Sequence, residues 1–117
     1  MQEKSYADFV QKKLKDGQAI LDGLDSDKAN LLHIAMGISG EAGELLDAVK
    51  KHVIYSKPLD MANVKEELGD LEFYMQAFRN WLGVERTNVI IGNVNKLNKR
   101  YEKGYSDEEA SLRKDKD

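Results

Sequence analysis

The sequence predicts an all-α protein, and three observations support this prediction. A single proline in 117 residues leaves long stretches free to form helices. Apolar residues recur with the 3.6-residue period of a helix, and no segment sustains the alternation of a β-strand. Turn and capping residues separate the periodic segments. We therefore expect a four-helix-bundle-like core followed by a short last helix.

The first two helices are expected on either side of Gly23. The first begins at Ser5 or Asp8, is weakened in its middle by Gly17 and ends at Gly23. The second runs from about Lys28 to His52 or Tyr55, and the segment 25–27 (Asp-Ser-Asp) supplies its N-cap. The apolar positions of this second helix keep the helical period: Leu31, Ile34, Ala35, Ile38, Ala42, Leu45, Val49 and Val53.

The third helix is expected between a turn at residues 56–60, where Asp60 acts as N-cap, and Gly83. A near-perfect a/d spacing predicts that its apolar stripe is buried. The stripe consists of Val64, Leu68, Leu71, Met75, Phe78 and Leu82.

Two further helices are expected after Gly83. The fourth runs from Glu85 or Arg86 to Tyr101, with apolar positions Val89, Ile90, Ile91, Val94 and Leu97. After a turn at residues 103–105, the segment 106–109 (Ser-Asp-Glu-Glu) opens a short last helix. We expect residues 1–112 to form a single helical domain and the charged residues 113–117 to be a disordered tail.

Composition excludes several classes of protein. The net charge of −3 argues against a protein that binds nucleic-acid polymers through a basic surface. No stretch approaches the ~20 apolar residues of a membrane span, and the first ten residues lack the apolar centre of a signal peptide. Zero cysteines exclude disulfides and thiolate zinc sites. The expected location is therefore the cytoplasm.

The most informative feature is two pairs of carboxylates, Glu41 with Glu44 and Glu67 with Asp70. Residues three apart lie side by side on one face of a helix. At a rise of ~1.5 Å per residue, the first pair lies roughly 14 Å before the end of its helix, and the second roughly 13 Å after Asp60. Antiparallel packing across the short turn therefore brings both pairs to nearly the same height. Four such carboxylates need a cation, and oxygen ligands favour Mg²⁺ or Mn²⁺.

Neighbouring residues leave some alternatives open. Glu66 could replace Glu67 as the partner of Asp70, although Glu67 lies nearer the apolar stripe, and Asp47 follows Glu44 by three residues. Three glycines interrupt the second helix, where each costs ~1 kcal/mol relative to alanine, which indicates that a ligand or another backbone comes close. These glycines are Gly37, Gly40 and Gly43.

Over residues 31–106 the chain resembles the MazG-like, all-α nucleoside triphosphate pyrophosphohydrolases. The resemblance rests on four blocks in a specific order and spacing. They are Leu31-Leu32-His33, Gly40-Glu41-Ala42-Gly43-Glu44-Leu45, Glu66-Glu67-Leu68-Gly69-Asp70-Leu71, and Asn93-Val94-Asn95-Lys96-Leu97 with Arg100-Tyr101. The chain departs from its relatives at Glu102, where they usually have proline after the Arg-Tyr pair.

This resemblance implies a function for the matching residues. The family cleaves the α–β phosphoanhydride bond of ribo- and deoxynucleoside triphosphates, which gives the monophosphate and pyrophosphate. Magnesium binds the carboxylates that match Glu41, Glu44, Glu67 and Asp70. The late-helix residues Asn93, Lys96 and Arg100 match phosphate contacts, and Tyr74 matches a residue of the substrate pocket. The family assembles as dimers or tetramers with sites near subunit interfaces, so a homodimer or homotetramer is implied.

The chemistry of phosphoryl transfer agrees with these roles. It needs phosphate oxygens whose charge is neutralised, an aligned water molecule and a leaving group that is held in place. Magnesium would neutralise the phosphate oxygens, and Glu41 or Glu44 would orient or deprotonate the water. Lys96 and Arg100, four residues apart, would offset charge on the leaving pyrophosphate.

Other residues have simpler explanations. For His33 we favour a structural or solvent-facing position, and His52 suits the negative end of a helix dipole. Phe78 and Trp81 are expected in the core or at an interface. A di-iron site fails because neither histidine follows a glutamate by three residues. The remaining rivals are a non-catalytic helical oligomerisation module and a module that binds nucleotides without cleaving them.

Overall fold

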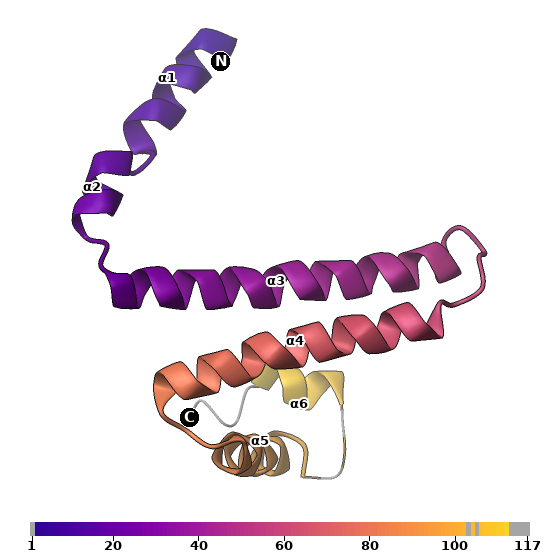
Figure 1. The fold of residues 1–117 in the computed structure, drawn as a ribbon. Coiled ribbons are helices and arrows are strands. Elements are labelled where there is room, and N and C mark those ends of the chain that lie inside the picture. The colour runs from indigo at the N-terminus through magenta and orange to yellow at the C-terminus, as the bar shows by residue number, and fades with distance from the viewer. Residues whose placement is uncertain (1, 103, 105, 113–117) are drawn as a thin grey trace. The chain divides into compact units, whose positions relative to one another are not determined.

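The computed structural model describes residues 2–102, 104 and 106–112, and every regular element in these ranges is a helix (Figure 1). The all-α prediction is therefore confirmed. The helices are α1 (Glu3–Lys13), α2 (Gly17–Asp22), α3 (Ser26–Val53), α4 (Met61–Leu82), α5 (Arg86–Arg100) and α6 (Asp107–Leu112). The predicted tail at 113–117 lies outside the described residues, as do Lys103 and Tyr105 of the predicted turn.

The chain divides into two compact units, Met1–His33 and Ile34–Asp117. In the first unit, the prediction of one helix up to Gly23 is wrong, because α1 ends at Lys13 and α2 begins at Gly17. The cause is Asp16, whose carboxylate accepts hydrogen bonds from the backbone N–H groups of Gln18 (3.0 Å) and Ala19 (3.3 Å). Such an N-cap starts a new helix. The predicted end at Gly23 is confirmed.

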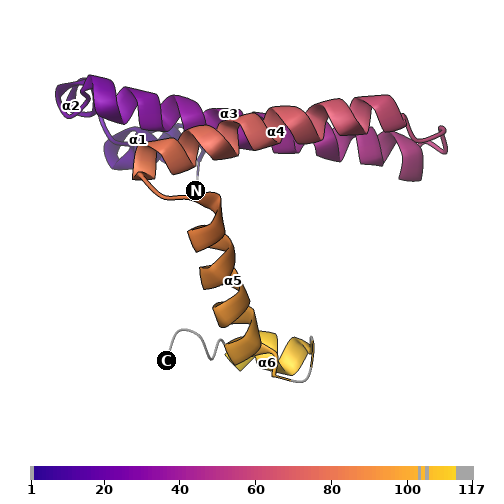
Figure 2. The ribbon, with the colours of Figure 1, turned by 60° about the horizontal axis from the view of Figure 1, so that its bottom comes forward.

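The second unit is built around a hairpin of α3 and α4, which lie side by side and antiparallel (Figures 1 and 2). The turn at residues 54–60 contains Ser56 with a φ of 54°. The Asp60 carboxylate accepts a hydrogen bond from the Asn63 backbone N–H at 3.0 Å, and α4 closes at Gly83, whose φ is 70°. The predicted caps of the third helix are therefore confirmed, and Gly83 provides the left-handed conformation of a helix end.

Along both helices of the hairpin, a set of half-buried residues recurs at alternating spacings of three and four, which is the pattern of a coiled-coil seam. On α3 these seam positions are Ile34, Ile38, Glu41 and Leu45, followed by the buried Ala48. On α4 they are Val64, Glu67, Leu71, Tyr74 and Phe78. Other half-buried residues flank the seam: Leu31, Gly37 and Asp47 on α3, and Asn63 and Ala77 on α4. Two glutamates therefore occupy positions that the pattern otherwise gives to apolar or aromatic residues.

The apolar stripe of α4 is predicted to be buried, but only half of its residues are shielded from solvent. Val64, Leu71 and Phe78 face the seam, but Leu68, Met75 and Leu82 are exposed. The apolar residues that recur with the helical period cover a wider side of α4 than the part that contacts α3. Helix α5 is similar, because all of its residues from 86 to 99 are exposed, including its predicted apolar positions.

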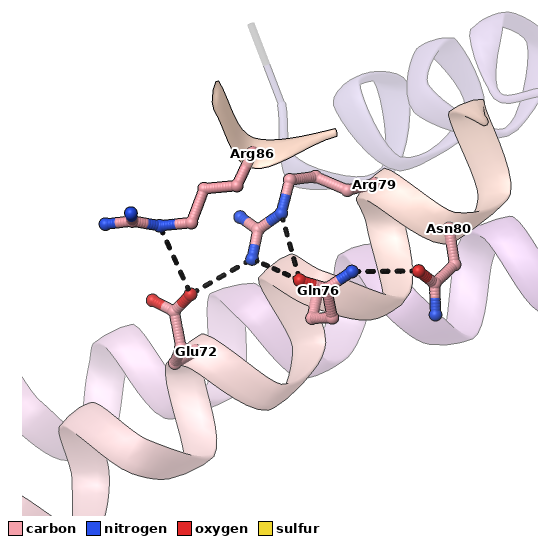
Figure 3. A network of polar contacts seen from close by, with 5 residues as sticks. All are labelled: Glu72, Gln76, Arg79, Asn80 and Arg86. Carbon is pink, nitrogen blue, oxygen red and sulfur yellow. Dashed lines mark hydrogen bonds and ion pairs between the residues drawn. The ribbon is translucent and has the colours of Figure 1, made fainter. Parts of the chain in front are cut away.

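A network of charged and amide groups joins the end of α4 to the start of α5 (Figure 3). Arg79 is the buried charged residue of the described chain, at 6% exposure. Its Nη2 atom donates hydrogen bonds to Glu72 Oε1 (3.0 Å) and Gln76 Oε1 (2.8 Å). Glu72 Oε1 also lies 4.0 Å from Nε of Arg86, the first residue of α5. Glu72 is therefore shared between two cations.

None of the helices in the described ranges is both long and apolar enough to cross a membrane.

Candidate metal centre and pocket

Three of the four predicted carboxylates come together at the middle of the hairpin. Glu41 on α3 and Glu67 and Asp70 on α4 each offer one oxygen, and these oxygens all lie within 4.8 Å of one another. Glu41 and Glu67 are half-buried in the seam, whereas Asp70 is exposed at its edge. The matched distances of the two pairs from the turn place these residues at one height.

The remaining acidic candidates lie outside this carboxylate cluster. Glu44 is exposed, although its charge contributes to raising the pKa of Glu67. Glu66 is exposed, whereas its neighbour Glu67 faces α3. Asp47 forms an ion pair with Lys51 (2.9 Å), and the Lys51 ammonium lowers the pKa of the Asp47 carboxyl. Asp47 is thus already neutralised by a cation of its own helix.

Crowding of negative groups changes the acidity of Glu67. Its pKa is raised from 4.5 to about 7, first by a hydrogen bond with the Glu41 carboxyl, then by desolvation and by the charges of Glu41, Asp70 and Glu44. The Glu67 Oε2 atom is buried without a hydrogen-bond partner. A buried oxygen without a donor is costly, and a bound cation would remove that cost.

The donor set fits a hard divalent cation. All ligand atoms are carboxylate oxygens, which suit Mg²⁺ and Mn²⁺ rather than softer metals. Both the unpartnered Oε2 atom and the raised pKa of Glu67 indicate excess negative charge that a cation would offset. Glu41, Glu67 and Asp70 could therefore hold such an ion, with Glu44 beside them.

An open pocket of about 320 Å³ adjoins the carboxylate cluster. Glu41 and Asp70 line it together with two aromatic residues, Phe73 and Tyr74. The Tyr74 ring lies directly against Gly37 of α3, where a Cβ atom would overlap the ring. The close approach predicted for three glycines is therefore found at Gly37, and it is made by a side chain.

At the other two glycines, Gly40 and Gly43, a Cβ atom would meet nothing within 4 Å. Sequence reasoning missed Phe73, which contacts Tyr74 edge to face with ring centroids 5.2 Å apart. The available signal was its position three residues after Asp70, which places it on the same side of α4.

The residues of α5 that are predicted to contact phosphate are not among the described residues that line this pocket. Asn93 and Lys96 are exposed, and Arg100 is half-buried with its guanidinium 5.9 Å from the ring centroid of Tyr101. In Figure 2, α5 extends away from the hairpin.

Both histidines and the aromatic pair Phe78 and Trp81 lie outside the lining of this pocket. The His52 ring shares a hydrogen bond with the Lys57 carbonyl oxygen at 2.8 Å within the turn. His33 is exposed. Phe78 and Trp81 form an edge-to-face pair with centroids 6.4 Å apart.

Comparisons with known proteins show the family to which the chain belongs. Residues 30–105 match the sequence model of the MazG nucleotide pyrophosphohydrolase domain, and this range contains all of the predicted site residues. Among curated proteins, the chain is similar to the Gene 37 protein of Mycobacterium phage L5, with 36% identity over 80 residues. This alignment covers 63% of the chain and 68% of the phage protein. No solved structure matches the chain.

Proposed function

Since the chain belongs to the MazG nucleotide pyrophosphohydrolase family, we propose that it hydrolyses the α–β phosphoanhydride bond of ribo- or deoxynucleoside triphosphates. The products are the nucleoside monophosphate and pyrophosphate, and the cofactor is Mg²⁺, with Mn²⁺ as a substitute. The observation that carries this proposal is the convergence of oxygens from Glu41, Glu67 and Asp70 beside an open pocket.

Each residue of the site has a role in the proposal. Glu41, Glu67 and Asp70 hold the metal, with Glu44 as a fourth ligand or as a second-sphere carboxylate. When bound, Mg²⁺ neutralises phosphate oxygens and acidifies a coordinated water. Glu41 or Glu44 orients the attacking water and accepts its proton, and the position of Glu44 beside the carboxylate cluster but outside it suits this role. Tyr74 borders the substrate at the pocket wall.

The basic residues of α5 complete the site in an assembly. We propose that Asn93, Lys96 and Arg100 contact the phosphates and that a second copy of the chain brings them there. Supporting this, the single chain leaves α5 exposed and buries little apolar surface: of the described apolar side chains, Ala48 is the buried one, at 7% exposure. A dimer or tetramer would also complete the four-helix bundle by covering Leu68, Met75 and Leu82.

Three further expectations belong to the same proposal. Residues 1–112 would act as a single MazG-like domain, the enzyme would work in the cytoplasm, and its substrate would be a nucleotide rather than a nucleic-acid polymer. The exposed apolar residues of α4 and α5 also favour one rival, a non-catalytic helical oligomerisation or nucleotide-binding module.

A panel of ribo- and deoxynucleoside triphosphates with Mg²⁺ tests the proposal. We expect equal amounts of monophosphate and pyrophosphate, with turnover abolished by a chelator and restored by Mg²⁺. Release of orthophosphate alone would show that a different bond is cleaved. Absence of turnover on every substrate, in a protein that remains helical and oligomeric, would favour the non-catalytic rival.

A further inference from the structure

The pocket beside the carboxylate cluster has two chemically distinct walls. Glu41 and Asp70 are its acidic lining, here called the acidic wall, and Phe73 and Tyr74 are its aromatic lining. The edge-to-face contact between the two rings, at an interplanar angle of 89°, holds them at a defined angle to one another. Since Gly37 backs the Tyr74 ring, this ring has a firm support on α3.

Phe73 is the most exposed of the described aromatic side chains, with 68% of its surface accessible. It takes no part in the seam, where the half-buried neighbours are Leu71 and Tyr74. Burying a phenylalanine is strongly favourable, so a ring left open at the rim of a pocket has surface available for an apolar ligand.

The position of Phe73 relative to Asp70 suits a nucleotide. Side chains three residues apart on a helix have Cβ atoms about 5–6 Å apart, so the ring and the carboxylate stand next to each other at the pocket. In a nucleoside triphosphate one sugar separates the base from the α-phosphate. A phosphate at the carboxylates therefore leaves the base within reach of the ring.

We propose that Phe73 stacks on the nucleobase of the bound nucleotide and is a substrate-binding residue of this chain. This inference rests on the proposed function, because it assumes that the phosphates bind at the carboxylate cluster. Every base has a π-face, so stacking of this kind tolerates all bases. Phe73 therefore contributes affinity for nucleotides as a class and little selection among them.

Binding measurements with the full chain test this role. Isothermal titration in Mg²⁺ would use non-hydrolysable α,β-methylene nucleoside triphosphates carrying four different bases, and inorganic tripolyphosphate as the probe without a base. Phe73→Ala should weaken the binding of every nucleotide analogue about 5- to 150-fold, the range that stacking on an aromatic side chain supplies. Tripolyphosphate binding should not change.

Two further variants keep the test specific. Phe73→Trp should retain nucleotide affinity because it keeps a planar face. Met61→Ala removes another largely exposed apolar side chain of α4 (60% exposure), which lies outside the pocket, and should leave nucleotide binding unchanged.

An equal loss of tripolyphosphate binding in Phe73→Ala would overturn the proposal, since the ring would then only shape the acidic wall. Unchanged nucleotide binding, or a loss confined to one base, would overturn it as well. Pyrophosphate release measured in parallel separates this inference from the proposed function. Turnover with no effect of Phe73→Ala on binding would refute the stacking alone, and stacking without turnover would refute the hydrolase.

Discussion

Glu41 and Glu67 meet across the α3–α4 seam through a hydrogen bond between their carboxyl groups, at positions where a coiled-coil pattern calls for apolar residues. Two carboxyl groups can share such a bond only when one of them is protonated, and a metal ion between them would take the place of that proton. The contact between Glu41 and Glu67 is therefore unfavourable when both are ionised and no cation is bound.

Glu67→Gln should lower pyrophosphate release at least 100-fold, because the amide removes a negative ligand from the carboxylate cluster. The adjacent Glu66→Gln is a matched control, since Glu66 is exposed and lies outside the cluster. The initial rate of pyrophosphate release with saturating Mg²⁺ is measured for both variants. Activity in Glu67→Gln together with loss in Glu66→Gln would assign the metal ligand to Glu66.

Without metal, thermal stability should fall as the pH rises from about 4.5 to about 7. The pKa of Glu67 is raised from 4.5 to about 7 in the folded protein, so the folded state binds more protons than the unfolded state in this interval. The contribution of Glu67 is therefore most favourable below pH 4.5 and is lost by pH 7. Melting curves in EDTA at a series of pH values, followed by circular dichroism, measure this slope. Glu67→Gln should lack this component of the slope, and an identical profile in both proteins would contradict the prediction.

Mg²⁺ should raise the melting temperature of the wild-type protein at pH 7.5 in a concentration-dependent manner, because a ligand of the folded state stabilises it by mass action. Binding near pH 6.5 should also release protons, since the metal displaces the proton held by Glu67. Calorimetry in two buffers of different ionisation enthalpy counts these protons. The shift in melting temperature should be much smaller in Glu41→Gln, and an equal shift would place the metal elsewhere.

Gly37→Ala should destabilise the protein by ~1–3 kcal/mol, because the added methyl group overlaps the Tyr74 ring. Gly40→Ala in the same helix meets nothing within 4 Å and should stabilise the protein by ~0.5–1 kcal/mol through helix propensity alone. Urea unfolding gives both free energies. Similar changes in the free energy of unfolding of the two variants would show that the contact between Tyr74 and Gly37 does not contribute to stability.

Met75→Glu should dissociate the proposed assembly, because it places a charge on the exposed apolar side of α4. Light scattering after gel filtration would measure the molar mass, with Met75→Leu as the control that keeps the apolar surface. A mass unchanged by the glutamate would exclude this side of α4 from the interface.

Local chemistry made much of the fold predictable. Asp60 and Gly83 end α4 because a carboxylate cap and a left-handed glycine each satisfy backbone groups at a helix end. The approach of Glu41 to Glu67 followed from helix rise and a short turn. The break before α2 is not predicted from Gly17, which by propensity alone only weakens a helix, whereas the Asp16 cap starts a new helix there.

Other features depend on contacts that a periodic pattern does not specify. The apolar side of α4 is visible in the sequence, but which of its residues meet α3 is decided by the angle of packing, so Leu68 was assigned to the core and is exposed. The position of Phe73 three residues after Asp70 indicates the side of α4 that the two share, but it does not indicate that the ring lines a pocket. The distance of Lys96 from the carboxylates depends on where α5 leaves α4, which helix rise does not fix.

An ion pair between exposed side chains links the start of α5 to α4. Glu72 lies between the guanidinium groups of Arg79 and Arg86 (Figure 3), while α5 itself is exposed up to residue 99. Of these two pairs, the one between Arg86 and Glu72 links α5 to α4, and both of its side chains are more than half exposed. Dissolved ions weaken exposed pairs of this kind. Raising the salt concentration should therefore weaken this link and leave the apolar contacts of the α3–α4 seam intact, which makes salt a means of loosening one joint of the molecule without unfolding it.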